Sequence, residues 1–269
     1  MKEFQALAEL DEGSQRALYD LLLILADTKH LLGLRYAEWI SAPEIEASIA
    51  AVSMAQDELG HARLLYSLVE PFHQELGWPE RPEEPSAYRN MEALDHEFAN
   101  WSQFVAVNAL LDSALFIQLN ALKDSSYLPL RGRLPKILEE ERYHFQHGRG
   151  WFLRLAAEPK TRPELQTALR TLWPQLLRWL GDPHSSALKA LCDSGILPST
   201  PEALQARFLE HIGPLLMQAQ FNAPREQLSW QGWDESFRRS NRRGPDETTW
   251  SQIVVPEARA YPVGGSAAI

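Results

Sequence analysis

Two Glu-x-x-His pairs are the residues of this 269-residue chain best suited to chemistry: Glu58 with His61, and Glu141 with His144. An α-helix advances by about 100° per residue, so positions three apart share a face and can bind the same metal ion. Imidazole nitrogen and carboxylate oxygen together favour a divalent first-row metal, whereas magnesium and calcium sites are usually built from oxygen alone. The two pairs therefore predict a site for first-row metals.

Each pair also has an acidic residue on the preceding helical segment, Glu38 before the first and Asp112 before the second. Four carboxylates and two imidazoles form the ligand set of a carboxylate-bridged di-iron or di-manganese centre in a four-helix bundle. The alternative for Asp112 is an inward carboxylate paired with a basic residue, but segment 110–115 contains no cation. The predicted metal ligands are Glu38, Glu58, His61, Asp112, Glu141 and His144.

A single Glu-x-x-His is a weak signal, because the chain contains a third copy at Glu70 and His73. That copy lies at the end of a predicted helix beside a proline and has no partner carboxylate, so we interpret it as a chance match. Glu140 also precedes His144, but at a spacing of four, whereas Glu141 repeats the spacing of three found in the first pair. The register therefore favours Glu141.

Hydrophobic periodicity predicts an all-α fold, a four-helix bundle with additional C-terminal helices and an extended tail. The proline-rich segment 77–85 is a predicted crossover between two helix pairs. We expect residues 1–221 to form the bundle and 222–269 an irregular extension, in the same domain or as a subunit-contact arm that ends in an extended segment over 256–269. The predicted helices are 14–41, 43–72, 90–123, 126–158, 162–181, 184–194 and 200–221.

Composition limits the compartment and the partners. A net charge of −10 argues against nonspecific binding to nucleic acid or to an anionic membrane. The single cysteine, Cys192, excludes an internal disulfide framework and fits a reducing compartment. We identify no apolar signal core at the N-terminus and expect no segment that could span a bilayer. The predicted location is the cytoplasm.

The metal motifs resemble those of the phenylacetic acid catabolic family, the ferritin-like subunits of the phenylacetyl-CoA epoxidase complex. Residues 56–63, QDELGHAR, resemble its first metal motif, and residues 111–115, LDSAL, resemble its aspartate ligand segment. Residues 140–144, EERYH, followed by GRGW at 148–151, resemble its second metal motif. The resemblance extends over most of residues 14–220 and implies a ferritin-like bundle.

The family has a catalytic branch with all six ligands and a structural branch that has lost metal ligands. This chain combines features of both. Its ligand set resembles the catalytic branch, whereas its length and segments 35–39 and 144–151 look more like the structural branch. The catalytic branch usually carries a lysine four residues before the first motif's glutamate, where this chain has Met54.

The resemblance implies a di-iron monooxygenase subunit with two iron ions or an iron–manganese pair. Glu38, Glu58 and His61 would hold one ion, and Asp112, Glu141 and His144 the other, with Glu58 and Glu141 as bridges. Such an enzyme takes NAD(P)H electrons through a separate flavin and iron–sulfur reductase. It uses O₂ to epoxidise the aromatic ring of phenylacetyl-CoA or a similar aromatic acyl-CoA. The carboxylates of the implied catalytic centre are Glu38, Glu58, Asp112 and Glu141.

Two alternatives to this function remain open: a non-catalytic structural subunit of the same multicomponent oxygenase, and a dimetal oxidase with another substrate. In each oxygenase role we expect a homo- or hetero-oligomer with a homologous ferritin-like subunit and the reductase. The basic segment 238–243 is either a solvated or subunit-contacting loop or a contact for coenzyme A phosphates, because arginine binds phosphate bidentately. The predicted phosphate contacts are Lys29, Arg238 and Arg239.

Overall fold

The computed structural model describes residues 2–80, 82–225 and 228–254. Within these ranges the chain is helical and has no strand, which confirms the predicted all-α class. The long helices of the bundle are α1 (Glu12–Ala37), α2 (Ile45–Tyr66), α4 (Trp101–Leu122) and α6 (Leu134–Ala157). The shorter helices are α3 (Glu70–Leu76), α5 (Leu128–Arg131), α7 (Arg162–Trp179), α8 (Ser186–Asp193), α9 (Pro201–Gln218) and α10 (Glu247–Ile253).

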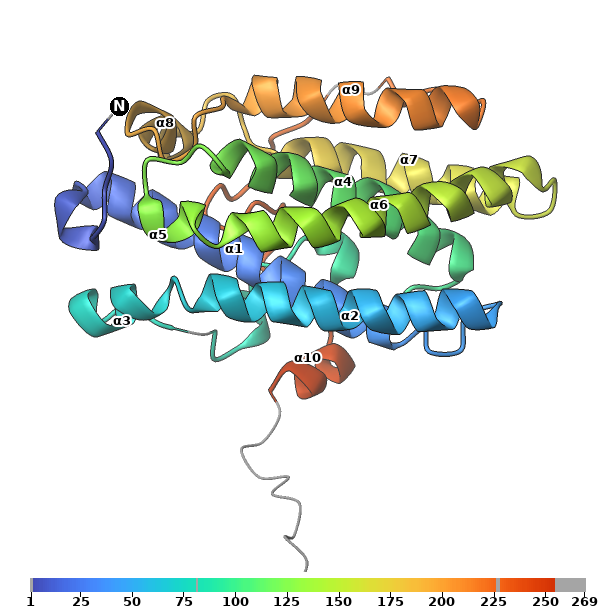
Figure 1. Ribbon diagram of the computed structural model, residues 1–269, viewed down its shortest axis with the longest axis horizontal. Coiled ribbons are helices and arrows are strands. Elements are labelled where there is room, and N and C mark those ends of the chain that lie inside the picture. Colours follow the sequence, from blue (N-terminus) through green and yellow to red (C-terminus); the bar gives the residue numbers. More distant parts are fainter. Residues whose placement is uncertain (1, 81, 226–227, 255–269) are drawn as a thin grey trace, which may run out of the picture.

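The four long helices form two packed pairs, α1 with α2 and α4 with α6. Figure 1 shows α2 and α6 side by side on the face toward the viewer, with α1 and α4 behind them. Helices α7 and α9 pack on α4, and α8 packs on α1, so these additional helices cover the side of the bundle away from α2. The arrangement leaves one interior position bordered by all four long helices.

Capping residues set the helix boundaries and correct two of the predicted ones. The side chain of Asp11 accepts a hydrogen bond from the Ser14 backbone N–H at 2.9 Å, so α1 begins at Glu12, two residues before the predicted start. Asn100 caps α4 in the same way through Gln103. The prediction of a helix over 90–100 is therefore wrong, apart from a 3-10 turn at Glu92–Leu94.

Helix α4 is the most apolar element. It is 22 residues long with a mean hydropathy of 1.5, so by length and composition it could cross a membrane, contrary to the expectation that no segment qualifies. However, 89% of this apolar window is buried inside the bundle. Its neighbours are α6, α7 and α9, and its apolar character is explained by its place at the centre of the core.

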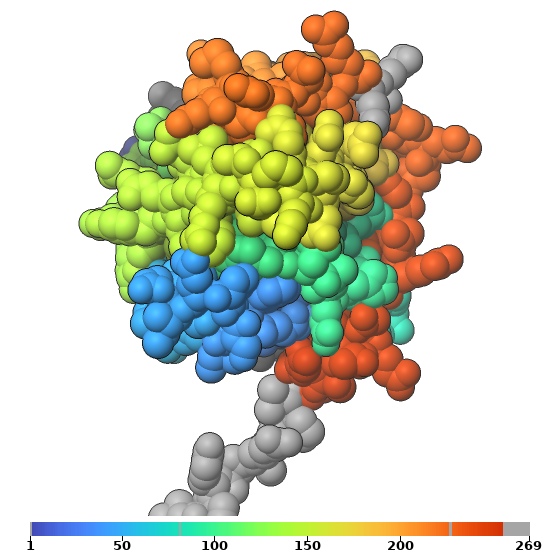
Figure 2. Space-filling model, turned by 90° about the vertical axis from the view of Figure 1, so that its right-hand side faces the viewer, coloured from blue at the N-terminus to red at the C-terminus, as the bar shows by residue number. Residues whose placement is uncertain are grey.

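Residues 228–254 lie against the bundle and include helix α10, which the sequence did not predict. Arg239 makes a buried ion pair with Asp95, and the backbone N–H groups of Ser240 and Asn241 donate to Glu92. Figure 2 looks onto the end of the bundle that carries the α1–α2 and α6–α7 turns, and the C-terminal segment lies along one side of this end. The predicted extended arm over 256–269 lies outside the described residues.

Candidate functional site

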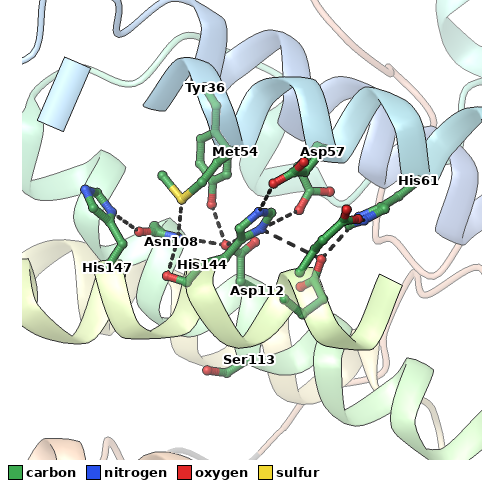
Figure 3. A network of polar contacts seen from close by, with 12 residues as sticks. Tyr36, Met54, Asp57, His61, Asn108, Asp112, Ser113, His144 and His147 are labelled. Carbon is green, nitrogen blue, oxygen red and sulfur yellow. Dashed lines mark hydrogen bonds and ion pairs between the residues drawn. The ribbon is translucent and has the colours of Figure 1, made fainter. Parts of the chain in front are cut away.

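The two Glu-x-x-His pairs meet in the interior of the bundle. Helix α2 supplies Glu58 and His61, α6 supplies Glu141 and His144, and α4 supplies Asp112. All five side chains are buried. His144 Nδ1 lies 3.1 Å from Glu58 Oε1, and His61 Nδ1 lies 3.4 Å from Glu141 Oε1. Each helix therefore points its carboxylate and its imidazole at the facing helix, as the spacing of three requires (Figure 3).

Two groups within the described residues have the donor atoms for a metal ion. One is Glu58, His61 and Glu141, and the other is Glu58, Asp112 and His144. Within each group the ligand atoms lie within 4.8 Å of one another, and Glu58 belongs to both. The structure thus brings together five of the six predicted ligands. His73, from the copy interpreted as a chance match, is exposed and contacts the Trp78 carbonyl instead.

An outer carboxylate holds each imidazole from behind. His61 Nε2 lies 2.7 Å from Glu140, and His144 Nε2 lies 3.3 Å from Asp57. The acid that contacts His144 of α6 is Asp57, which immediately precedes Glu58 on α2. The acid that contacts His61 of α2 is Glu140, which immediately precedes Glu141 on α6. The arrangement is therefore reciprocal between α2 and α6. Metal-bound histidines usually have such a partner on the second ring nitrogen. Asp57 and Glu140 occupy matching positions, one residue before Glu58 and Glu141, and this match is the sequence signal that could have identified both.

Helix α1 contributes Lys29 to the interior position, which local sequence did not reveal. Its Nζ lies 2.8 Å from a Glu58 carboxylate oxygen and forms a second ion pair with Glu141. All three side chains are 0% exposed. Burial alone would lower the pKa of Lys29, but the carboxylates of Glu141, Glu58 and Asp112 outweigh it and raise that pKa. The ammonium group is therefore charged and links α1 to both α2 and α6.

The pKa of the Glu141 carboxylate is lowered, which is the change opposite to that at Lys29. Burial opposes its ionisation, but the charge of Lys29 and the hydrogen bond from His61 hold its pKa well below the usual value. Burial would likewise lower the pKa of His144, yet its hydrogen bonds to Asp57 and Glu58 raise that pKa to about 11. Lys29 and protonated His144 thus balance two of the three interior carboxylates without any added cation.

Glu38, the ligand predicted from α1, lies outside the cluster of five buried ligand residues supplied by α2, α4 and α6. It follows the last residue of α1, and its carboxylate forms an ion pair with Arg35 at 2.6 Å. Glu38 is nine residues beyond Lys29. At about 1.5 Å of rise per residue this places it roughly 13 Å further along the helix axis. The carboxylate therefore faces the end of the bundle near Thr249, to which Arg35 also donates.

Asp112 is held by neutral donors. The Tyr36 hydroxyl donates to its Oδ2 at 2.8 Å, and Asn108 Nδ2 donates to the same oxygen at 2.7 Å. Asn108 in turn accepts from His147 Nδ1, as Figure 3 shows. Burial and the nearby charges of Glu58 and Glu141 raise the pKa of Asp112. Tyr36 lies two helical turns from Lys29, so both reach the interior from the same face of α1.

The donor set tests whether a dimetal centre fits this site. Buried carboxylate oxygens with no hydrogen-bond partner among the described residues include Asp112 Oδ1 and Glu141 Oε2. These two atoms come from α4 and α6, and they suit metal ligation. The corresponding group from α1 is a cation, and the bundle pattern requires a fourth carboxylate there. The residues present therefore do not fit a six-ligand dimetal centre, because Lys29 occupies the position of one ligand.

The three residues predicted to contact coenzyme A phosphates are placed differently from that expectation. Lys29 is enclosed at the bundle centre. Arg238 is buried and donates to Gln118 Oε1 at 2.9 Å, and Arg239 is buried against Asp95. Arg238 and Arg239 join the C-terminal segment to the bundle. None of the three side chains presents a free guanidinium or ammonium group at the surface.

A family model described as "Phenylacetic acid catabolic protein" matches residues 1–257. The chain belongs to the phenylacetic acid catabolic protein family. Its helical architecture is that of the ferritin-like bundle predicted from the metal motifs.

Two components of the 1,2-phenylacetyl-CoA epoxidase of Escherichia coli (strain K12) resemble this chain. The C component is 28% identical over 248 residues, which cover 87% of this chain and 95% of that protein. The A component is 25% identical over 182 residues, which cover 65% of this chain and 58% of that protein. Both relatives are subunits of one epoxidase.

Proposed function

We propose that this chain is a structural, non-catalytic ferritin-like subunit of a multicomponent oxygenase that acts on phenylacetyl-CoA or a similar aromatic acyl-CoA. The substrate class and the assembly with a homologous subunit are supported by the similarity to two components of one epoxidase. The non-catalytic role rests on one observation. Lys29, fully buried, forms ion pairs with both Glu58 and Glu141 in the interior position where the family pattern requires a ligand.

In this role the interior residues hold the bundle together. Lys29 joins α1 to α2 and α6, while the reciprocal pairs His61–Glu140 and His144–Asp57 join α2 to α6. The subunit thus has a defined shape to present to a partner. Iron, O₂ and electrons from NAD(P)H through a flavin and iron–sulfur reductase would be used by the homologous catalytic subunit.

The second candidate is the di-iron monooxygenase itself, or a dimetal oxidase of another substrate. It is favoured by the two groups of donor atoms around Glu58. In that case five residues would hold the metals, which would supply O₂ activation, and Lys29 would have to leave its ion pairs. The residues concerned are Glu58, His61, Asp112, Glu141 and His144.

Metal content and reconstitution distinguish the two candidates. The purified chain is incubated anaerobically with ferrous iron, and bound metal is measured by mass spectrometry. It is then combined with a homologous catalytic subunit and the reductase, and oxygen uptake is followed with phenylacetyl-CoA. The structural role predicts no bound metal, no turnover by this chain with reductase alone, and a hetero-oligomer by size exclusion with light scattering. About two metal ions per chain, or turnover without the second subunit, would refute it.

A further inference from the structure

We infer that the interior of this bundle is a latent dimetal centre, which Lys29 keeps closed and which the single substitution Lys29→Glu would open. This inference rests on the proposed function, in which the wild-type chain holds no metal. It adds that only one of the six ligand positions has been lost. The remaining donors keep an arrangement suited to metal.

The orientation of the imidazoles is the first support. Both histidines turn Nδ1 toward the interior carboxylates and Nε2 toward an outer acid. A metal-bound imidazole needs this division of its two nitrogens, with one free to ligate and the other fixed by an acceptor. A site that served only to pack helices would not require it, and the reciprocal use of Asp57 and Glu140 provides it on both sides.

The second support is the free-energy cost of burying three carboxylates in this cluster. Glu58, Asp112 and Glu141 are all buried at the centre of the fold. Replacing buried ionic groups with apolar side chains of similar volume is often neutral or stabilising, so stability alone does not explain them. In addition, Asp112 Oδ1 and Glu141 Oε2 have no partner among the described residues. The cluster has more donor atoms than one ammonium group can satisfy.

The position of Lys29 is the third support. Its Nζ contacts Glu58, which is common to both metal-capable groups, and Glu141, which belongs to one of them. Both carboxylates belong to the group of Glu58, His61 and Glu141, so the Lys29 side chain enters that group from α1. A glutamate at residue 29 would start from the same backbone position on the same face. It would convert the cation into the fourth carboxylate of the dimetal pattern.

The test compares Lys29→Glu with wild type and with Lys189→Glu. Lys189 is exposed and, among the described residues, forms its ion pair with Asp193, so this control makes the same charge change away from the site. Each protein is dialysed anaerobically against ferrous iron or Mn²⁺, and bound metal is measured by mass spectrometry. We expect about two ions per chain for Lys29→Glu and near zero for the others. Metal should also raise the melting temperature of Lys29→Glu alone.

A folded Lys29→Glu protein that binds no more metal than wild type overturns the inference but leaves the proposed function standing. Wild type that itself binds two ions overturns the proposed function and, with it, the inference that Lys29 keeps the centre closed. Repulsion among four acids could prevent Lys29→Glu from folding without metal. Ferrous iron supplied during expression should then restore the fold, and Lys29→Met, which removes the cation without adding an acid, should take up at least one ion. Failure of both also overturns the inference.

Discussion

The ion pair between Lys29 and Glu141 can be tested by a double-mutant cycle on metal-free protein. Lys29→Met keeps a side chain of similar length but leaves Glu58 and Glu141 buried without their shared cation. Glu141→Gln removes the charge at the other end. If the two side chains interact as the structure shows, the effects of the single substitutions will not add in the double variant.

The expected size follows from the complete burial of both partners. Removing one member of a buried ion pair costs about 3–5 kcal/mol of the unfolding free energy, because the other charge remains buried without compensation. Independent effects would sum to about 6–10 kcal/mol in the double variant. In the double variant Glu141 is neutral and only Glu58 is left without Lys29, so its cost should stay close to that of Lys29→Met alone. The coupling energy should therefore be about 3 kcal/mol.

Urea unfolding followed by circular dichroism, in the presence of a chelator, measures the four free energies. The exposed pair Lys189 and Asp193 is the matched control within the chain, and its cycle should show no coupling beyond experimental error. Additive single effects at Lys29 and Glu141, or a Lys29→Met variant as stable as wild type, would refute the proposed ion-pair closure of the bundle.

Three further predictions concern other buried positions. Burial raises the pKa of Asp27 from 3.8 to about 6, so the folded state binds its proton more tightly than the unfolded state. Stability should fall by about 3 kcal/mol as pH rises through about 4 to 6, and a pH series of unfolding curves should be flatter over that range for Asp27→Asn. A Cβ on Gly148 would lie 2.9 Å from backbone atoms of α4, whereas one on Gly150 meets nothing within 4 Å. Gly148→Ala should cost about 1–3 kcal/mol in thermal unfolding, and Gly150→Ala should not destabilise; equal effects would contradict the close packing. Arg239→Met should cost about 3–5 kcal/mol by leaving Asp95 buried without its cation, and faster limited proteolysis after α9 would show the loosened C-terminal segment.

Local spacing determined the part of the site that lies within single helices. Residues three apart on a helix share a face whatever surrounds it, so the sequence alone predicted that Glu58 would act with His61 and Glu141 with His144. The apolar pattern of α4 placed Asp112 inside the core for the same reason. The all-α class and the crossover between two helix pairs also followed from periodicity and proline placement.

The contribution of α1 was decided only by tertiary packing. Lys29 and Glu38 are both ionisable residues of the first helical segment, and nothing in their local sequence states which one lies level with Glu58. That depends on how far α1 is shifted along α2, and the shift is set by contacts between distant residues. At Gly33 the two helices approach so closely that a Cβ would lie 2.8 Å from the Leu59 side chain. With α1 in this position, Lys29 lies at the centre of the bundle and Glu38 at its end.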